Sequence, residues 1–166
     1  MGVTHVAVCG PDPASDEVAA MGEEVGRLLA RAGAVLVCGG LGGMMEAAAR
    51  GASEEGGVTL GILPGKSRAS ANPHLTVSIP TGMGEMRNAL IVRSADVLIA
   101  VAGEFGTLSE IAFALKSGVP VVGLRTWELS KGGRRVDAFP RADSPRQAVE
   151  LALALGSPAA PGSLET

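Results

Sequence analysis

Short apolar segments alternate with longer segments of helical periodicity along most of the chain, and this alternation restricts the fold more than any other feature. Six apolar runs have the length of strands: residues 3–9, 34–38, 58–63, 75–79, 96–101 and 119–124. Apolar residues recur at helical spacing over five segments: residues 15–32, 44–53, 84–94, 106–117 and 144–155. Apolar strands that alternate with helices are typical of a parallel sheet that is covered on both faces.

We therefore predict a single α/β domain of the Rossmann-like type. It should contain an open, mostly parallel sheet of about six or seven strands with helices on both faces. The 166 residues suit one domain, which we expect to span residues 1–155, followed by a flexible tail at 156–166. The polar segment 66–74 is expected to form a mobile surface loop, and residues 131–135 a second loop.

Composition and charge exclude several classes of protein. Aromatic residues make up only 2% of the chain and the net charge is −3, so the features of nucleic-acid binders are missing. No apolar run is long enough to span a membrane, and the N-terminus leads directly into a strand, so we expect a cytoplasmic protein. Two cysteines, Cys9 and Cys38, are too few for a disulfide framework or a metal site.

Three predicted strand-to-helix turns have an unusual composition, and all lie at the edge where open parallel sheets bind ligands. The first comprises the glycine-rich residues 39–43, followed by a helix from Met44. Glycines let backbone amides approach a phosphate, and a helix N-terminus adds unpaired donors. A tight connection that binds no ligand explains these glycines equally well.

The second turn, at residues 103–110, permits two interpretations. Thr107 and Glu110 have the spacing of a capping box, in which Thr107 caps the helix and Glu110 reaches back to the amide of Thr107. Alternatively, the amides of Gly106 and Thr107 bind a phosphate and the Glu110 carboxylate lies in the pocket.

The third turn, at residues 81–88, places Arg87 early in a predicted helix. A planar guanidinium suits phosphate recognition, although a solvated surface arginine is the alternative. The three turns together predict a pocket for a small phosphorylated ligand. The predicted ligand contacts are Gly10, Gly39, Gly40, Gly42, Gly43, Met44, Thr81, Gly82, Arg87, Asn88, Gly103, Glu104, Phe105, Gly106, Thr107 and Glu110.

At these turns the chain resembles the Rossmann-like superfamily once labelled lysine decarboxylases, which includes the LOG phosphoribohydrolases and the molybdenum cofactor carrier proteins. The LOG signature is Pro-Gly-Gly-x-Gly-Thr-x-x-Glu, and Gly103, Gly106, Thr107 and Glu110 match it. Arg87 matches the arginine of the Met-His-x-Arg-Lys segment that precedes this signature.

The chain departs from the LOG pattern at several positions. Ala102 and Glu104 replace the proline and the second glycine of the signature, while Glu85 and Asn88 replace the histidine and the lysine. The pattern Thr-Gly-x-Gly-x-x-Arg-Asn, together with residues 62–65 and 71–73, is closer to the carrier-protein branch.

The resemblance implies a carrier-like binding protein for a nucleotide or a molybdenum cofactor-type pterin phosphate, with no required cofactor, assembled as a dimer or tetramer. The alternative is a LOG-like hydrolase that cleaves the N-glycosidic bond of nucleoside 5′-monophosphates, with Arg87 and Glu110 as catalytic residues. A pure assembly module is a third possibility. A pyridoxal-dependent decarboxylase is excluded, because Lys66, Lys116 and Lys131 are the only lysines and none has a pocket-like context.

Overall fold

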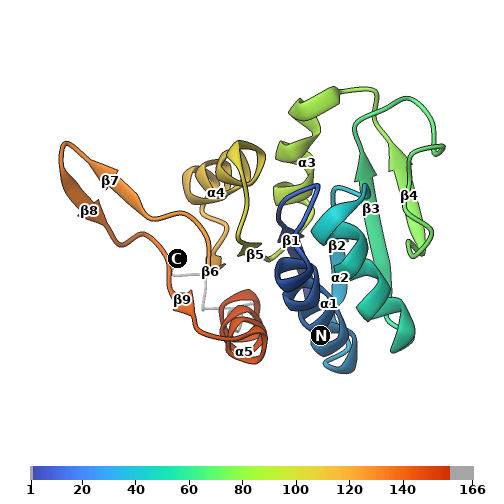
Figure 1. Ribbon diagram of the computed structural model, residues 1–166, viewed down its shortest axis with the longest axis horizontal. Helices are drawn as coiled ribbons and strands as arrows, with labels where there is room; N and C mark the ends of the chain where they lie inside the picture. Colours follow the sequence, from blue (N-terminus) through green and yellow to red (C-terminus); the bar gives the residue numbers. More distant parts are fainter. Residues whose placement is uncertain (1, 158–166) are drawn as a thin grey trace, which may run out of the picture.

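The six apolar runs and one further short strand, which was not predicted, form a seven-stranded parallel sheet in the computed structural model, which describes residues 2–157 (Figure 1). The strand order is β4-β3-β2-β1-β5-β6-β9, and every neighbouring pair is parallel. The strands are β1 (His5–Cys9), β2 (Val35–Cys38), β3 (Thr59–Leu63), β4 (Val77–Pro80), β5 (Val97–Val101), β6 (Val121–Leu124) and β9 (Arg141–Ala142). This arrangement confirms the predicted Rossmann-like class.

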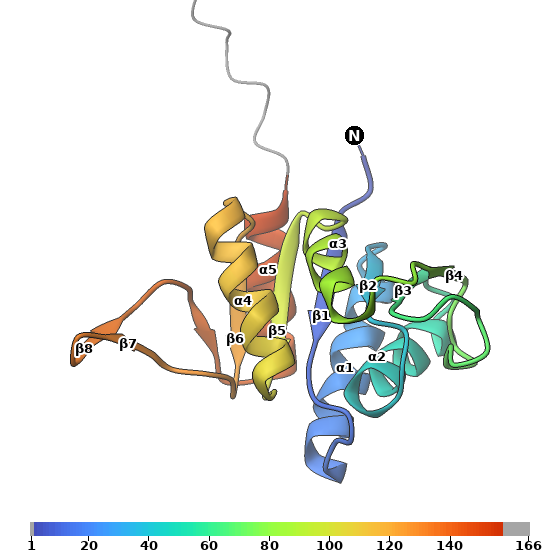
Figure 2. The same cartoon turned by 90° about the horizontal axis from the view of Figure 1, so that it is seen from above.

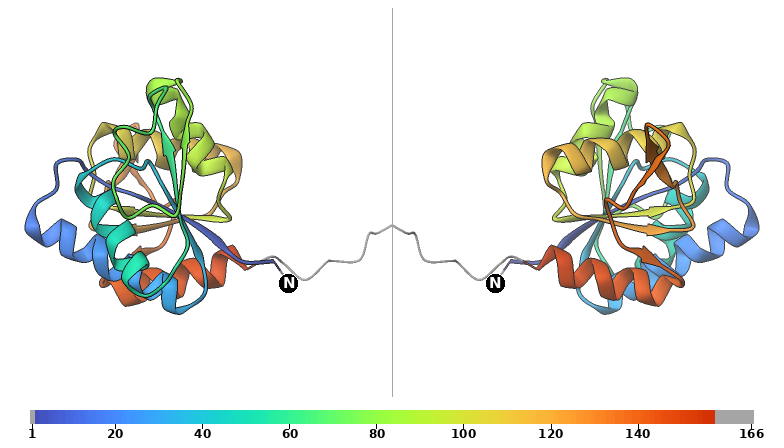
Figure 3. Two further views of the ribbon diagram at one scale, coloured as in Figure 1. Left: turned by 90° about the vertical axis from the view of Figure 1, so that its right-hand side faces the viewer. Right: turned by 90° about the vertical axis from the view of Figure 1, so that its left-hand side faces the viewer.

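Helices cover both faces of the sheet, which Figure 3 shows edge-on. They are α1 (Asp16–Arg31), α2 (Gly43–Glu54), α3 (Asn88–Arg93), α4 (Phe105–Ser117) and α5 (Pro145–Gly156), with a 3-10 helix, η1 (Gly84–Arg87), before α3. One apolar core lies between the sheet and α1, α2 and α5, and the other lies between the sheet and α3 and α4. Alternate side chains of the central strands β1, β2, β5 and β6 therefore enter opposite cores, as the pleat of a strand requires.

The strand order reverses between β1 and β5. The chain runs outward from β1 to β2 and β3, and later outward from β5 to β6 and β9. The helices that follow β1 and β5 lie on opposite faces, which opens a crevice at the carboxyl ends of these two strands. The crossover through η1 and α3 returns from the edge strand β4 to β5 and passes this crevice.

Two predicted segments have a different structure. Residues 131–135 are not an irregular loop: β7 (Leu129–Lys131) and β8 (Arg134–Val136) form an antiparallel hairpin that projects from the domain (Figure 2). Gly132 and Gly133 both have positive φ, as a two-residue hairpin turn requires, but charged flanking residues hid the strand pattern. The predicted helix 84–94 is divided into η1 and the short helix α3.

The polar segment 66–74 is attached to the β2–α2 turn through Asn72, which is buried. Its side-chain amide donates to the carbonyl of Leu41 at 3.0 Å, and its backbone amide donates to the carbonyl of Gly40 at 3.0 Å. Asn72 therefore fixes the segment beside the glycine turn, while Arg68 and His74 bond it to β4 and β3.

At the C-terminal end, α5 extends to Gly156, and residues 158–166 of the predicted tail lie outside the described residues. None of the helices within residues 2–157 is long and apolar enough to cross a membrane.

Candidate functional site

Two adjoining spaces at the carboxyl edge of the sheet bring most of the predicted site residues together. A cavity of about 120 Å³, here called the Glu110 cavity, is lined by Cys9, Gly10, Gly39, Met45, Arg87, Asn88, Gly106, Thr107 and Glu110. A groove of about 570 Å³, here called the Phe105 groove, shares four of these residues and adds Asp12, Leu41, Pro64, Glu85, Phe105 and Ser109. Side chains from β1, the β2–α2 turn, η1 and α4 therefore meet at one place.

Arg87 is buried rather than solvated, with only 8% of its surface exposed. Its Nε donates to the carbonyl of Ile62 at 2.8 Å, Nη2 donates to the carbonyl of Gly39 at 3.4 Å, and Nη1 donates to Oδ1 of Asn88. Because a guanidinium has five N–H donors, two remain for a ligand in the cavity. Desolvation lowers the pKa of Arg87, although a guanidinium stays charged in proteins.

Glu110 is the buried acid of the cavity, with 7% of its surface exposed. Burial raises the pKa of its carboxyl to about 7, against smaller opposing effects of the Cys9 thiol and the Arg87 charge. Burial likewise raises the pKa of the Cys9 thiol well above its ordinary value, and the nearby Glu110 adds to this effect. The carboxyl of Glu110 therefore changes charge close to neutral pH, as groups that act in acid–base chemistry do.

The capping-box interpretation of Thr107 and Glu110 is wrong. Helix α4 begins at Phe105 with Glu104 as its N-cap residue, so Thr107 lies inside the first turn and is buried. Since Leu108 makes the first helical hydrogen bond, to the carbonyl of Glu104, the amides of Phe105, Gly106 and Thr107 have no acceptor within the helix. Two of these three residues line the Glu110 cavity.

Neither the backbone conformation nor the packing of the protein requires a glycine at position 106. Its φ is not in the left-handed region, and a Cβ at this position would meet no atom within 4 Å. It borders both the Glu110 cavity and the Phe105 groove. A missing side chain here leaves room for a ligand next to the amides of α4.

Two glycines of the β2–α2 turn, in contrast to Gly106, are required by the backbone conformation and packing of the protein. Gly40 and Gly43 have φ of 76° and 62°, and a Cβ on Gly43 would lie 2.5 Å from the carbonyl oxygen of Pro11. The amide of Met44 already donates to that carbonyl at 3.0 Å, and the Asp12 carboxylate lies beside Gly42. Of this turn, Gly39 lines the Glu110 cavity.

Met44, Thr81 and Gly82 are predicted site residues that have packing or turn roles. Met44 is completely buried, beneath Gly10. The Thr81 hydroxyl donates to the carbonyl of Leu63 at 2.7 Å and accepts from the amide of Met83, which shapes the turn at Gly82. Thr81 therefore fixes the start of the crossover that leads to Arg87.

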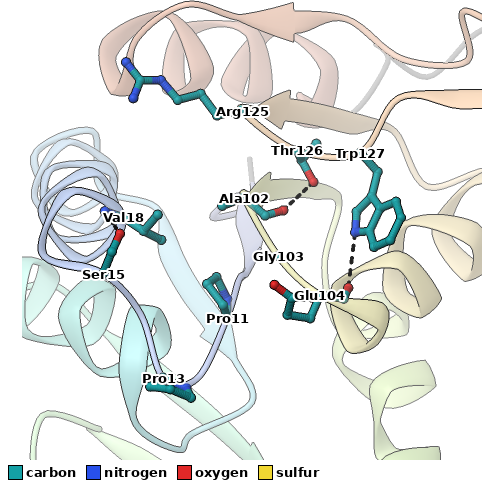
Figure 4. A pocket seen from close by; sticks show the side chains of 10 residues that line it. All are labelled: Pro11, Pro13, Ser15, Val18, Ala102, Gly103, Glu104, Arg125, Thr126 and Trp127. Atoms are coloured by element: carbon teal, nitrogen blue, oxygen red, sulfur yellow. Dashed lines mark hydrogen bonds between the residues drawn. The ribbon is translucent and has the colours of Figure 1, made fainter.

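A third space, here called the Trp127 pocket, borders the Gly103–Glu104 turn and has a volume of about 520 Å³ (Figure 4). Its lining comprises Pro11, Pro13, Ser15, Val18, Ala102, Gly103, Glu104, Arg125, Thr126 and Trp127. Sequence reasoning placed Gly103 and Glu104 at the site but missed Trp127 and Arg125. One feature of the sequence could have indicated this pocket: Trp127, the only tryptophan of the chain, lies just after a predicted strand.

A parallel sheet with this strand order and glycine-rich turns at its carboxyl edge is typical of the Rossmann-like class of α/β proteins. The chain matches the SLOG cluster4 family over residues 3–151 and belongs to that family. An uncharacterized protein of Archaeoglobus fulgidus is 42% identical over 134 residues, which cover 81% of this chain and 88% of that protein.

Two solved structures resemble the whole domain. The molybdenum cofactor binding protein from Rippkaea orientalis is 33% identical with a TM-score of 0.83, covering 93% of this chain and 98% of that chain. The molybdenum cofactor carrier protein from Chlamydomonas reinhardtii is 30% identical with a TM-score of 0.80, again covering 93% and 98%. The similarity therefore extends over the sheet, the crevice and the helices on both faces.

Proposed function

We propose that this protein is a carrier-like binding protein for a small phosphorylated heterocycle, with a molybdenum cofactor-type pterin phosphate as its ligand. The observation that carries the proposal is the convergence of three donor groups on the Glu110 cavity. The amides of Gly106 and Thr107 lack helical acceptors, and the buried guanidinium of Arg87 lines the same space. Helix amides together with an arginine fork are a common way to bind a phosphate.

The charge of the cavity agrees with an anionic ligand. Arg87 contributes a fixed positive charge, whereas the carboxyl of Glu110, with its pKa raised to about 7, is uncharged in about half of the molecules at that pH. A neutral carboxyl does not repel a phosphate and can donate a hydrogen bond to it.

The two similar structures support the pterin phosphate as the ligand, because their proteins are described as binding or carrying the molybdenum cofactor. We extend that description to this chain as part of the proposal, together with a homo-oligomeric state and a cytoplasmic location.

Mass spectrometry of the small molecules released on denaturation tests the proposal, using protein expressed in a host that makes the molybdenum cofactor. A pterin phosphate or its oxidation product should be released from the wild type. Gly106→Val, which fills the space beside the α4 amides, should release at least about tenfold less, given the loss of charge-assisted hydrogen bonds. Ala112→Val is the matched control, because Ala112 is an exposed residue of the same helix. Equal recovery from both variants would contradict the proposal.

A hydrolase acting on nucleoside 5′-monophosphates is the second candidate, favoured by one observation. Glu110 is buried in the same cavity as Arg87 and changes charge near pH 7. Such a carboxylate suits stabilisation of an oxocarbenium-like transition state. Release of adenine from AMP that increases as pH rises through about 7, and that Glu110→Gln abolishes, would establish this activity. Release that is unaffected by Glu110→Gln would exclude the mechanism.

A further inference from the structure

The Trp127 pocket lies where the strand order reverses, at the carboxyl ends of β1, β5 and β6 (Figure 4). Open parallel sheets bind their ligands at this point. The volume of about 520 Å³ is within the range of small-molecule sites and more than four times that of the Glu110 cavity. Gly103 and Glu104 line the Trp127 pocket, and Gly106 and Thr107 line the Glu110 cavity, so both spaces border the turn that leads into α4.

Most polar groups of this pocket already have partners within the protein. The Thr126 hydroxyl donates to the carbonyl of Ala102 at 2.5 Å, and the Trp127 indole N–H donates to the carbonyl of Glu104 at 3.2 Å. The Ser15 hydroxyl accepts from the amide of Val18, and Arg125 pairs with Glu17 at the rim.

The Glu104 carboxylate differs from these groups. It makes no capping hydrogen bond to α4, and within residues 2–157 it has no ion-pair or hydrogen-bond partner. In Figure 4 its side chain extends into the pocket towards Pro11. A carboxylate is an acceptor with two oxygens, so it suits a ligand that presents N–H donors.

Flat apolar groups make up part of the lining beside Glu104. Pro11, Pro13 and the Trp127 ring form much of the lining, and Trp127 packs against Phe105 with ring centroids 5.4 Å apart. Phe105 and Trp127 are two of the four aromatic residues of the chain, and Phe105 is 76% exposed. Flat apolar surfaces suit a planar ring better than a strongly hydrated group such as a phosphate.

Two non-glycine residues of this pocket have left-handed backbone conformations. They are Ala102, with φ of 48°, and Arg125, with φ of 51°, directly after β5 and β6. Such conformations persist where the surrounding structure enforces them, and they concentrate at binding sites. Here they direct the backbone around the mouth of one pocket.

We infer that the Trp127 pocket binds the ring of the ligand and that Glu104 is its specificity residue. The ring recognised by Glu104 is a planar heterocycle with two adjacent N–H donors, the 2-amino-4-oxopyrimidine edge that pterins and guanine share. The two carboxylate oxygens accept from the ring N–H and the amino group together. The negative charge of Glu104 keeps the phosphate on the Arg87 side of the turn. The inference deepens the proposed function and rests on it for the phosphate half of the ligand.

Fluorescence titration with pterin and lumazine tests the inference, because lumazine carries an oxygen where pterin has its 2-amino group. Wild-type protein should bind pterin about tenfold or more tightly than lumazine, the typical effect of a hydrogen bond to a charged group. Glu104→Gln should lose most of this preference, since an amide has only one accepting oxygen. Glu128→Gln, which neutralises an exposed acid outside the pocket lining, should keep it.

GMP and IMP also differ by the 2-amino group. Titration with these two nucleotides therefore shows whether the pocket recognises this edge in a pterin or in a guanine nucleotide. A Glu104-dependent preference for pterin alone, for GMP alone or for both supports the inference and assigns the source. Equal affinities within both pairs for the wild type, or a preference that Glu104→Gln leaves unchanged, would overturn it.

Failure of this inference is separate from failure of the proposed function. Pterin and lumazine carry no phosphate, so Gly106→Val should leave their affinities unchanged while it weakens binding of the phosphorylated ligand.

Discussion

The turns after β2 and β5 are both rich in glycine and both lead into a helix, yet their glycines and backbone amides have different surroundings. In the β2–α2 turn the glycines serve the protein: the amide of Met44 is bonded to the carbonyl of Pro11, and Gly43 is packed against that carbonyl. In the β5–α4 turn, a Cβ on Gly106 would meet no atom within 4 Å, and Gly106 lines a cavity.

The difference shows that a glycine-rich strand-to-helix turn identifies a ligand site only when the amides have no partner in the protein. A helix N-terminus attracts an anion because its first amides are unpaired. At α2, Pro11 and the nearby Asp12 carboxylate already provide negative groups. At α4 the cap residue Glu104 does not bond these amides, and they remain available for a ligand.

The largest expected effect of a substitution within these turns is on stability, at the β2–α2 turn. Gly43→Ala places a Cβ 2.5 Å from the carbonyl of Pro11 at a φ of 62°. The variant should lose about 2–4 kcal/mol of unfolding free energy, from strain and overpacking together. Urea denaturation measures this loss. Gly65→Ala, at an ordinary φ with no atom within 4 Å, should change stability by less than about 1 kcal/mol. Equal stabilities would mean that the packing of this turn is not rigid.

The second prediction concerns pH and the buried acid of α4. Because the pKa of Glu110 is raised in the folded protein from 4.5 to about 7, ionisation of this group opposes folding. The neutral carboxyl therefore contributes fully to stability below about pH 4.5. This contribution is lost as pH rises through about 7, and the unfolding free energy falls by up to about 3 kcal/mol.

Denaturant unfolding at pH 5 and pH 8 measures this effect. Glu110→Gln should show a smaller loss of stability between the two pH values than the wild type, whereas the exposed Glu128→Gln should keep the wild-type difference. If Glu110→Gln keeps the full wild-type difference, Glu110 does not titrate in this range.

The third prediction separates binding from stability at the β5–α4 turn. Gly106→Val should weaken the phosphorylated ligand about tenfold, because its side chain occupies the space next to the α4 amides. Its unfolding free energy should change by less than about 0.5 kcal/mol, since valine is a slightly better helix former than glycine. Calorimetry and urea denaturation of the same preparation measure the two quantities. A loss of stability comparable with that of Gly43→Ala would remove the contrast between the turns.

The smallest expected effect is at Asn72, which supports the β2–α2 turn from the loop side. Asn72→Ala removes the hydrogen bond from the side-chain amide to the carbonyl of Leu41 and should lower the unfolding free energy by about 1 kcal/mol. Thermal denaturation compares it with Ser70→Ala, which replaces an exposed residue of the same loop and should be neutral. A neutral Asn72→Ala would mean that the loop is not anchored by this side chain.

Much of the fold was predictable, because its signal is local. The alternation of apolar runs and helical periods predicts the strands and helices of the sheet within a few residues, and glycines mark most of their ends. The hairpin at residues 129–136 escaped prediction because its strands are exposed and charged, so they lack an apolar pattern.

The candidate site was predictable as a set of turns but not as an arrangement of side chains. Arg87 belongs to a crossover, and its burial depends on carbonyls of Gly39 and Ile62, which are 48 and 25 residues away in the sequence. The role of Glu110 was ambiguous for a similar reason, because the capping-box spacing is a local pattern and the start of α4 at Phe105 is not encoded by it.

The sequence by itself determined the class of fold, its family resemblance and the three turns at which a ligand could bind. Tertiary structure alone decided that the amide of Met44 bonds the carbonyl of Pro11 at one turn, that the amides of the other turn remain free, and that Trp127 and Glu104 line one pocket. The physical reason is that backbone conformation follows local residue preferences, whereas the partners of an amide or a carboxylate come from segments that only the folded sheet brings together.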